Sequence, residues 1–128
     1  MSDQKSAYMS LPEHDKHGNY LIIKAMLEEH RFVDASAFMY CLSLLCRACW
    51  LLTFAELISN PPENVSVSSI YTLREATSSN TLSNLNIHYP GVEPKLKREY
   101  EKLSDIKDPI VRCRIIVQNV KEKESIHG

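Results

Sequence analysis

The residues of this sequence with the clearest chemical potential are Cys46 and Cys49, which form a Cys-x-x-Cys pattern. Two thiols at this spacing can form a disulfide or supply half of a zinc site. Redox chemistry favours the pattern at the start of a helix, where the helix dipole stabilises a thiolate. A zinc site needs a second pair of ligands, which Cys41 and Cys113 do not supply. Because we expect Cys46 and Cys49 in the middle of a helix, we interpret them as core thiols and predict no metal and no cofactor.

Histidines and catalytic motifs give no stronger signal. His14 and His17 have the spacing of a metal clip, but they lie in a polar segment that we expect to be solvated. The sequence contains no serine nucleophile elbow, Walker loop, Rossmann glycine pattern or His-Glu-x-x-His motif. We therefore predict that the chain is not an enzyme. The alternative is a helical enzyme of nuclease-like type, with four candidate catalytic residues: His30, Tyr71, Arg74 and His88.

The composition is that of one globular domain. The chain has 128 residues, of which 44% are hydrophobic and 24% are charged. Only 3 glycines and 6 prolines are present, which argues against a turn-rich all-β fold. The N-terminal segment lacks a basic region followed by an apolar one, so we predict a cytoplasmic protein with reduced cysteines.

The charge of the chain does not favour nucleic acid as a partner. The net charge is −1, so the protein has no overall basic field. Residues 95–128 carry more basic than acidic side chains, but both signs are interspersed along this segment. Such mixing is typical of a solvated helix with ion pairs on its surface. Nucleic-acid binding is therefore an alternative and not the prediction.

Helical periodicity predicts five segments, at about 20–32, 35–59, 69–78, 94–104 and 109–124. Asn19 and Asp34 precede the first two segments and can cap them. Two prolines after Asn60 end the second segment, because proline cannot continue the hydrogen-bond ladder. The last segment has the β-branched residues of a strand, but its Asp-Pro start favours a helix.

The predicted organisation is a single helical domain over residues 18–124, with a flexible lead-in over 1–17 and a tail over 125–128. Residues 77–86 are mostly Ser, Thr and Asn, whose side chains compete with the backbone for hydrogen bonds, so we predict a loop or a frayed helix there. The expected fold class is all-α: an irregular four- to five-helix bundle around a long buried central helix, about 35–59.

The central segment raises the question of a membrane span. It is long enough, because a spanning helix needs roughly 20 predominantly apolar residues. However, Arg47 would lie near the bilayer centre at a cost of about 2.5 to 3.5 kcal/mol, and Glu56 would add to that cost. A helix that is apolar on nearly all sides also suits the centre of a bundle. We therefore predict that the chain does not associate with a membrane.

A polar strip on the predicted central helix is a candidate cleft. Tyr40, Ser43 and Arg47 fall on one helical face and could receive an acidic group of a partner. If Arg47 is buried it needs a partner within the domain, for which Glu29, Glu75 and the carbonyl groups at a helix end are candidates. Otherwise its long stem carries the charge to the surface.

These observations favour a non-catalytic protein–protein interaction module. By analogy of size and charge alone, we expect a small bacterial immunity or antitoxin-type protein that sterically neutralises a toxin, such as a basic nuclease. The candidate partner-binding residues lie in the first predicted helix and in the middle of the chain: Glu28, Glu29, Tyr71, Arg74, Glu75 and Tyr89. The alternatives are a small helical nucleic-acid-binding protein and the helical enzyme described above.

Overall fold

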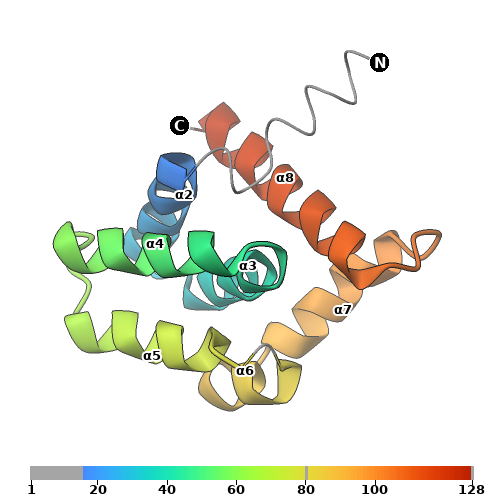
Figure 1. Cartoon of the computed structure of the whole chain (residues 1–128), viewed down its shortest axis with the longest axis horizontal. Helices are drawn as coiled ribbons and strands as arrows, with labels where there is room; N and C mark the ends of the chain where they lie inside the picture. The colour runs from blue at the N-terminus through green and yellow to red at the C-terminus, as the bar shows by residue number, and fades with distance from the viewer. Residues whose placement is uncertain (1–15, 80, 128) are drawn as a thin grey trace.

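The computed structural model describes residues 16–79 and 81–127, and this part of the chain contains seven helices and no strand. The predicted all-α fold, an irregular helical bundle, is confirmed, although the described ranges form seven helices and not the four to five that were predicted (Figure 1). The helices are α2 (Lys16–Glu28), α3 (Phe32–Leu45), α4 (Arg47–Ser59), α5 (Val67–Thr77), α6 (Leu82–His88), α7 (Val92–Lys102) and α8 (Pro109–His127). Over the described ranges, none of them combines the length and the apolar character that a membrane span requires.

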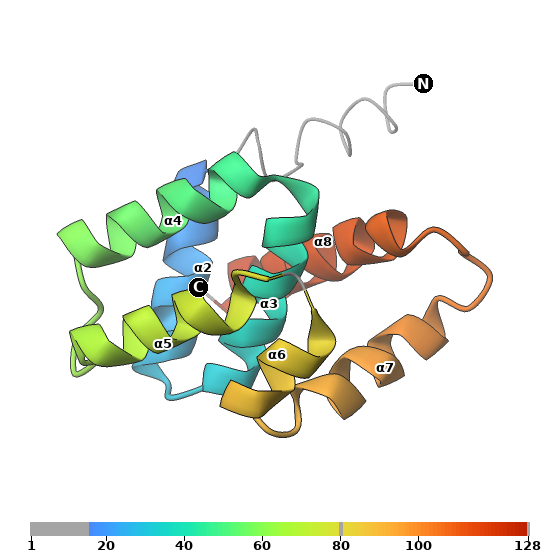
Figure 2. The same ribbon diagram turned by 60° about the horizontal axis from the view of Figure 1, so that its bottom comes forward.

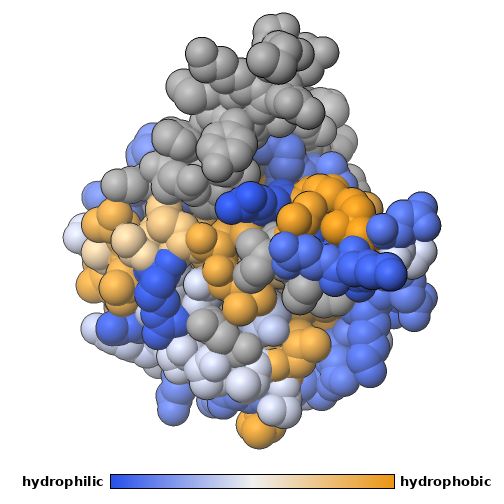
Figure 3. All heavy atoms as spheres, turned by 45° about the vertical axis from the view of Figure 1, so that its right-hand side comes forward, coloured by the Kyte–Doolittle hydropathy of each residue, from blue (hydrophilic) through white to orange (hydrophobic). Residues whose placement is uncertain are grey.

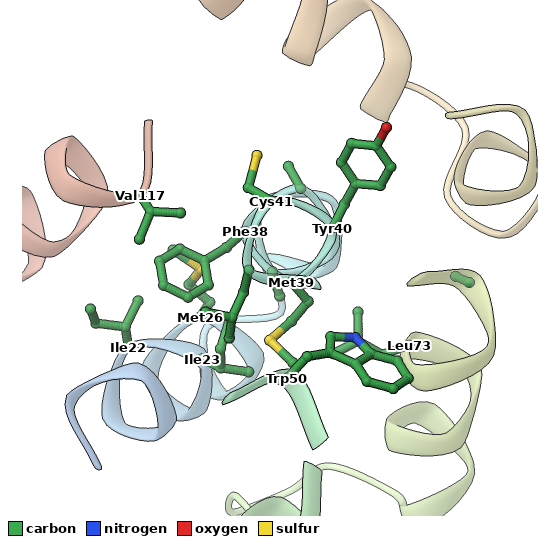
Figure 4. Packing of buried hydrophobic residues seen from close by; sticks show 14 of the residues in the cluster. Ile22, Ile23, Met26, Phe38, Met39, Tyr40, Cys41, Trp50, Leu73 and Val117 are labelled. Atoms are coloured by element: carbon green, nitrogen blue, oxygen red, sulfur yellow. The ribbon is translucent and has the colours of Figure 1, made fainter. Parts of the chain in front are cut away.

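Helix α3 is the centre of the bundle. It contacts α2, α4, α5, α7 and α8, and residues 35–43 are all buried. Figure 4 shows that its side chains spread in different directions: Phe38 points toward Met26 of α2, whereas Met39 points toward Trp50 of α4. A helix surrounded in this way must be apolar on every side. The predicted buried central helix therefore exists, but only over its first half.

The single helix predicted over 35–59 is wrong, because the segment forms two helices that meet at Cys46. The backbone of Cys46 is extended, with φ −156° and ψ 97°. Its N–H donates to the carbonyl of Leu42 at 2.8 Å and closes α3. Its Sγ accepts a hydrogen bond from the N–H of Cys49 at 3.3 Å and caps α4. The chain turns at this point (Figure 2), so that α4 packs on α2 and α5, whereas α3 reaches α7 and α8 in addition to these two helices.

The Ser/Thr/Asn-rich segment, predicted as a loop or a frayed helix, contains helix α6. The side chain of Thr81 caps this helix by accepting a hydrogen bond from the N–H of Asn84 at 3.3 Å. Asn84 Nδ2 donates to the carbonyls of Glu75 and Ala76, at 3.1 and 2.9 Å, and so ties α6 to the end of α5. Leu85 is fully buried. The polar side chains therefore act as caps of a short helix and do not prevent it.

Other helix boundaries also differ from the prediction. Asn19 lies inside α2 and is buried, so it does not cap that helix. Asp34 lies in the first turn of α3, which begins at Phe32. The last segment is a helix, as predicted, and it continues to His127 instead of ending at 124. The predicted lead-in, 1–17, lies almost entirely outside the described residues.

Helix α2 ends in a left-handed turn at His30, whose φ is 58°. The N–H of His30 donates to the carbonyl of Leu27 at 3.0 Å, and the N–H of Arg31 donates to that of Met26 at 2.8 Å. These two hydrogen bonds form a Schellman motif, in which glycine is the usual residue at the left-handed position. The turn reverses the chain between α2 and the central helix.

Candidate functional site

Helices α4 and α5 lie side by side and run in opposite directions (Figure 1, Figure 2). A buried hydrogen bond joins them, because the indole Nε1 of Trp50 donates to Oγ1 of Thr77 at 2.8 Å. The Trp50 ring also packs edge-on against Phe54, with 5.1 Å between the ring centroids. Helix α5 is capped by Ser66, whose Oγ accepts from the N–H of Ser69 at 3.2 Å. These contacts hold the two helices together and define the surface between them.

An apolar groove of about 410 Å³ lies between these helices on the surface. We call it the α4–α5 groove, and it is lined by Leu51, Phe54, Ala55, Ile58, Ile70, Tyr71 and Arg74. Three of its large side chains are substantially exposed: Leu51 at 45%, Ile58 at 38% and Tyr71 at 51%. Val67 is also exposed, one turn before Tyr71 on α5. Contiguous exposed apolar surface of this kind marks binding sites more often than ordinary surface.

Two arginines give one end of the α4–α5 groove a positive charge. Arg74 lines the groove, and Arg47 precedes Leu51 by one turn on the same side of α4. Arg47 Nη1 donates to Ser43 Oγ at 2.9 Å, and its guanidinium lies 4.0 Å from the centre of the Trp50 ring. In the part of the chain that the structure describes, neither arginine has a carboxylate within ion-pair distance.

Two of the six predicted partner-binding residues, Tyr71 and Arg74, come together in this groove. Glu75 is exposed on α5 but does not line the groove. Tyr89 lies with Phe32 in a separate, shallower concavity of about 340 Å³. Burial raises the pKa of the Tyr89 hydroxyl to about 12. Tyr89 thus contributes more to packing than to an open surface.

The other two predicted residues, Glu28 and Glu29, lie at the end of α2 and are engaged within the domain. Glu28 accepts a hydrogen bond from the N–H of Glu63 at 2.9 Å and pairs with Lys24 at 3.0 Å. The hydrogen bond from Glu63, and next that from Lys24, lowers the pKa of Glu28. Glu29 pairs with Arg31 at 3.2 Å. Glu28 thus ties the end of α2 to the segment before α5, whereas the pair of Glu29 with Arg31 is exposed. The role of both acids in partner binding stays a prediction.

The candidate cleft of Tyr40, Ser43 and Arg47 does not open to the surface. Tyr40 and Ser43 are buried, and burial raises the pKa of the Tyr40 hydroxyl. Arg47 is exposed, so its charge reaches the surface and is not buried against Glu29 or Glu75. The reason is the turn at Cys46, which directs the start of α4 outward.

The sequence did not predict that the apolar residues of the groove are exposed. In one continuous helix over 35–59, Leu51, Ala55 and Ile58 would belong to the core. As a separate helix, α4 already has a complete buried face, formed by Cys49, Trp50, Thr53, Phe54 and Leu57. Apolar residues on the opposite side are therefore more than packing requires. This excess becomes visible only when α4 is known to be a separate helix, so the sequence alone carried no signal for it.

A second cavity, of about 170 Å³, lies between α2, α3, α7 and α8 under a cluster of charges. Asp34 accepts a hydrogen bond from Arg31 Nε at 2.9 Å and also pairs with Lys95. Burial raises the pKa of Asp34, but the hydrogen bonds from Lys95 and Arg31 outweigh it and lower the pKa overall. The charges at this cavity satisfy one another, so the cluster is explained as a tie between α3 and α7.

The side of the molecule that carries α7 and α8 mixes hydrophilic and hydrophobic residues (Figure 3). Lys97 pairs with Glu93 at 3.0 Å, and Lys102 pairs with Glu99 at 3.3 Å. Lysines that are paired with acids do not form the continuous basic surface that phosphates require.

No group of three or more His, Cys, Asp or Glu side chains that could hold a metal occurs among residues 16–79 and 81–127. The α4–α5 groove is thus the best-defined candidate site, and its residues are the basis for its interpretation. Comparisons of the chain with protein-family models, curated proteins and solved structures find no match.

Proposed function

We propose that this domain is a non-catalytic interaction module that binds an amphipathic helix of another protein in the α4–α5 groove. The observation that carries the proposal is the exposure of Leu51, Ile58 and Tyr71 around one groove. Removing apolar surface from water contributes roughly 25 cal/mol per Å². Two helices with an apolar groove between them can accept a third helix, which is a recurrent mode of peptide recognition.

Charge defines a second property of the partner. Arg47 and Arg74 lie at the same end of the helix pair, near the hydrogen bond between Trp50 and Thr77. A complementary helix therefore has apolar residues at three- and four-residue spacing and an acidic residue at one end. Tyrosine and arginine are among the residue types that contribute most to binding at interfaces.

Capture of the partner from the source cells by tagged variants tests the proposal. Leu51→Glu places a charge in the groove and should abolish capture of the protein that the wild type retains in stoichiometric amount. Tyr71→Ala should weaken its binding by about tenfold or more. Ile87→Glu is the matched control, because Ile87 is an apolar residue of α6 that is 75% exposed and does not line the groove. Equal capture by Leu51→Glu and Ile87→Glu would contradict the proposal.

The narrower form of the proposal is that the partner is a toxin, and that the domain covers its active site in the cytoplasm. Its support is the small size and the near-neutral net charge of the chain, which suit immunity and antitoxin proteins. Co-expression of the captured protein with the domain tests this form. This form is supported if the wild-type domain protects the cells from growth arrest and the Leu51→Glu variant does not. A captured protein that is harmless by itself would exclude the toxin while leaving the binding module.

A further inference from the structure

The Cys46 and Cys49 pair lies at the start of a helix and not in the middle of one, in contrast to the expectation from the sequence. Cys46 is the N-cap of α4, and the N–H of Cys49 donates to its Sγ at 3.3 Å. The two sulfur atoms are 2.7 Å apart. A disulfide bond is about 2.05 Å long, so the sulfurs need to approach by less than a further ångström.

The two thiols differ in accessibility. Cys46 is partly exposed, whereas Cys49 is fully buried. The first can therefore meet a reagent from solution, and the second lies within reach of the sulfur of the first. This is the arrangement of an attacking thiol and a resolving thiol.

The surroundings favour thiol chemistry over metal binding. The described part of the chain places no third His, Cys, Asp or Glu beside the pair to complete a metal site. Cys41 and Cys113 are buried elsewhere in the core. The chemistry available at this position is therefore that of two thiols.

We propose that Cys46 and Cys49 are a redox-active dithiol that exchanges with low-molecular-weight disulfides. The Cys46 thiolate attacks one sulfur of the disulfide, a mixed disulfide forms, and the other half leaves as a thiolate that takes up a proton. The Cys49 thiol then attacks Cys46 Sγ, the mixed disulfide breaks, and the second half takes up the Cys49 proton and leaves as a thiol. The protein loses two electrons and two protons, and the small disulfide is reduced to two thiols.

This site is independent of the binding function proposed above and is tested separately. The folded wild type is incubated with oxidised and reduced glutathione at increasing ratios, and the remaining thiols are alkylated and mapped by mass spectrometry. We expect the mass of the protein to fall by that of two hydrogen atoms, and only Cys46 and Cys49 to be protected from alkylation. The fluorescence of Trp50, the only tryptophan, should change at the same ratio, because its ring lies next to this helix start.

Two single variants separate the roles of the thiols. Cys49→Ser should accumulate a glutathione adduct on Cys46, because no thiol is left to resolve it. Cys46→Ser should form neither the adduct nor the disulfide, and Cys41→Ala is the control that should behave as the wild type. The proposal is overturned if the wild type stays reduced at every ratio, or if the mapped disulfide involves Cys41 or Cys113. Mapping the oxidised cysteines of the wild type tests the proposed disulfide even if a variant does not fold.

Discussion

The buried hydrogen bond between Trp50 and Thr77 shows how a single polar contact positions the α4–α5 groove. The indole N–H of Trp50 is buried and needs an acceptor, since an unpaired buried donor loses its hydration without compensation. Thr77 Oγ1 is that acceptor, and it also donates to the carbonyl of Leu73 at 3.0 Å. The contact therefore fixes α4 on α5 at the charged end of the groove.

Removal of this acceptor should destabilise the domain. Thr77→Val keeps the shape of the side chain but leaves the indole N–H without its partner. We expect the free energy of unfolding to fall by about 1 to 3 kcal/mol, measured by urea denaturation. Thr72→Val is the matched control on the same helix, because Thr72 is exposed. Its effect should stay within about 0.5 kcal/mol, and equal effects of the two variants would contradict this account.

The left-handed position of His30 yields a second prediction at the residue scale. His30→Gly removes the steric strain that a side chain causes at a positive φ. This gain in free energy exceeds the cost of ordering a glycine, which is more flexible in the unfolded chain. We expect the free energy of unfolding to rise by about 0.5 to 1 kcal/mol. His30→Ala removes the imidazole but keeps the Cβ, so it should give no such gain. A glycine variant no more stable than the alanine variant would show that this turn is not strained.

Some functional residues were predictable one by one, and others were not. Tyr71 and Arg74 were predicted at the surface of the middle segment, and the structure places both in the groove. The exposure of Leu51 and the capping role of Cys46 were not predictable, because both depend on where α4 begins. That point is decided by packing against other helices and not by local sequence.

At the scale of elements, the turn between α3 and α4 has the largest consequences. No proline or glycine occurs between residues 35 and 59, so local preference predicts one continuous helix. Helix α3 packs on α7 and α8 as well as on α2 and α5, whereas α4 packs on α2, α3 and α5, so the two helices leave Cys46 in different directions. The same turn exposes Arg47, opens the groove and puts two thiols at a helix start.

The contact between α3 and α7 should make stability depend on pH. The pKa of Asp34 is lowered from its ordinary value of 3.8, since the hydrogen bonds from Lys95 and Arg31 exceed the effect of burial. Because the pKa of Asp34 is lower in the folded state, its ionised carboxylate stabilises the folded protein above pH 3.8. This stabilisation is lost as the pH falls through the pKa that Asp34 has in the folded state. Asp34→Asn should therefore be less stable than the wild type at neutral pH.

The same variant should show a shallower loss of stability on acidification, measured by urea denaturation between about pH 6 and pH 3. Lys95→Met removes one of the two cationic partners of Asp34 and should give an intermediate pH dependence. Parallel curves for the wild type and Asp34→Asn would mean that this carboxylate does not link the two helices in solution.

At the scale of the whole molecule, composition and periodicity were enough to predict an all-α bundle. The few glycines, the periodic apolar residues and the helix-ending prolines all predicted helices. The arrangement of the helices was not predictable in this way, because it depends on contacts between residues far apart in sequence. The α4–α5 groove is a product of that arrangement, so its residues could be identified only partly from the sequence.

The most direct test of the central claim is site-specific photo-crosslinking in the source cells. A photoreactive phenylalanine analogue replaces Leu51 in the groove and, in a control protein, Ile87 on α6. We expect a single crosslinked protein at position 51, attached through a helical segment with apolar residues and an acidic residue, and no such product at position 87. The same product from both positions, or none from position 51, would contradict the claim that the α4–α5 groove binds a partner.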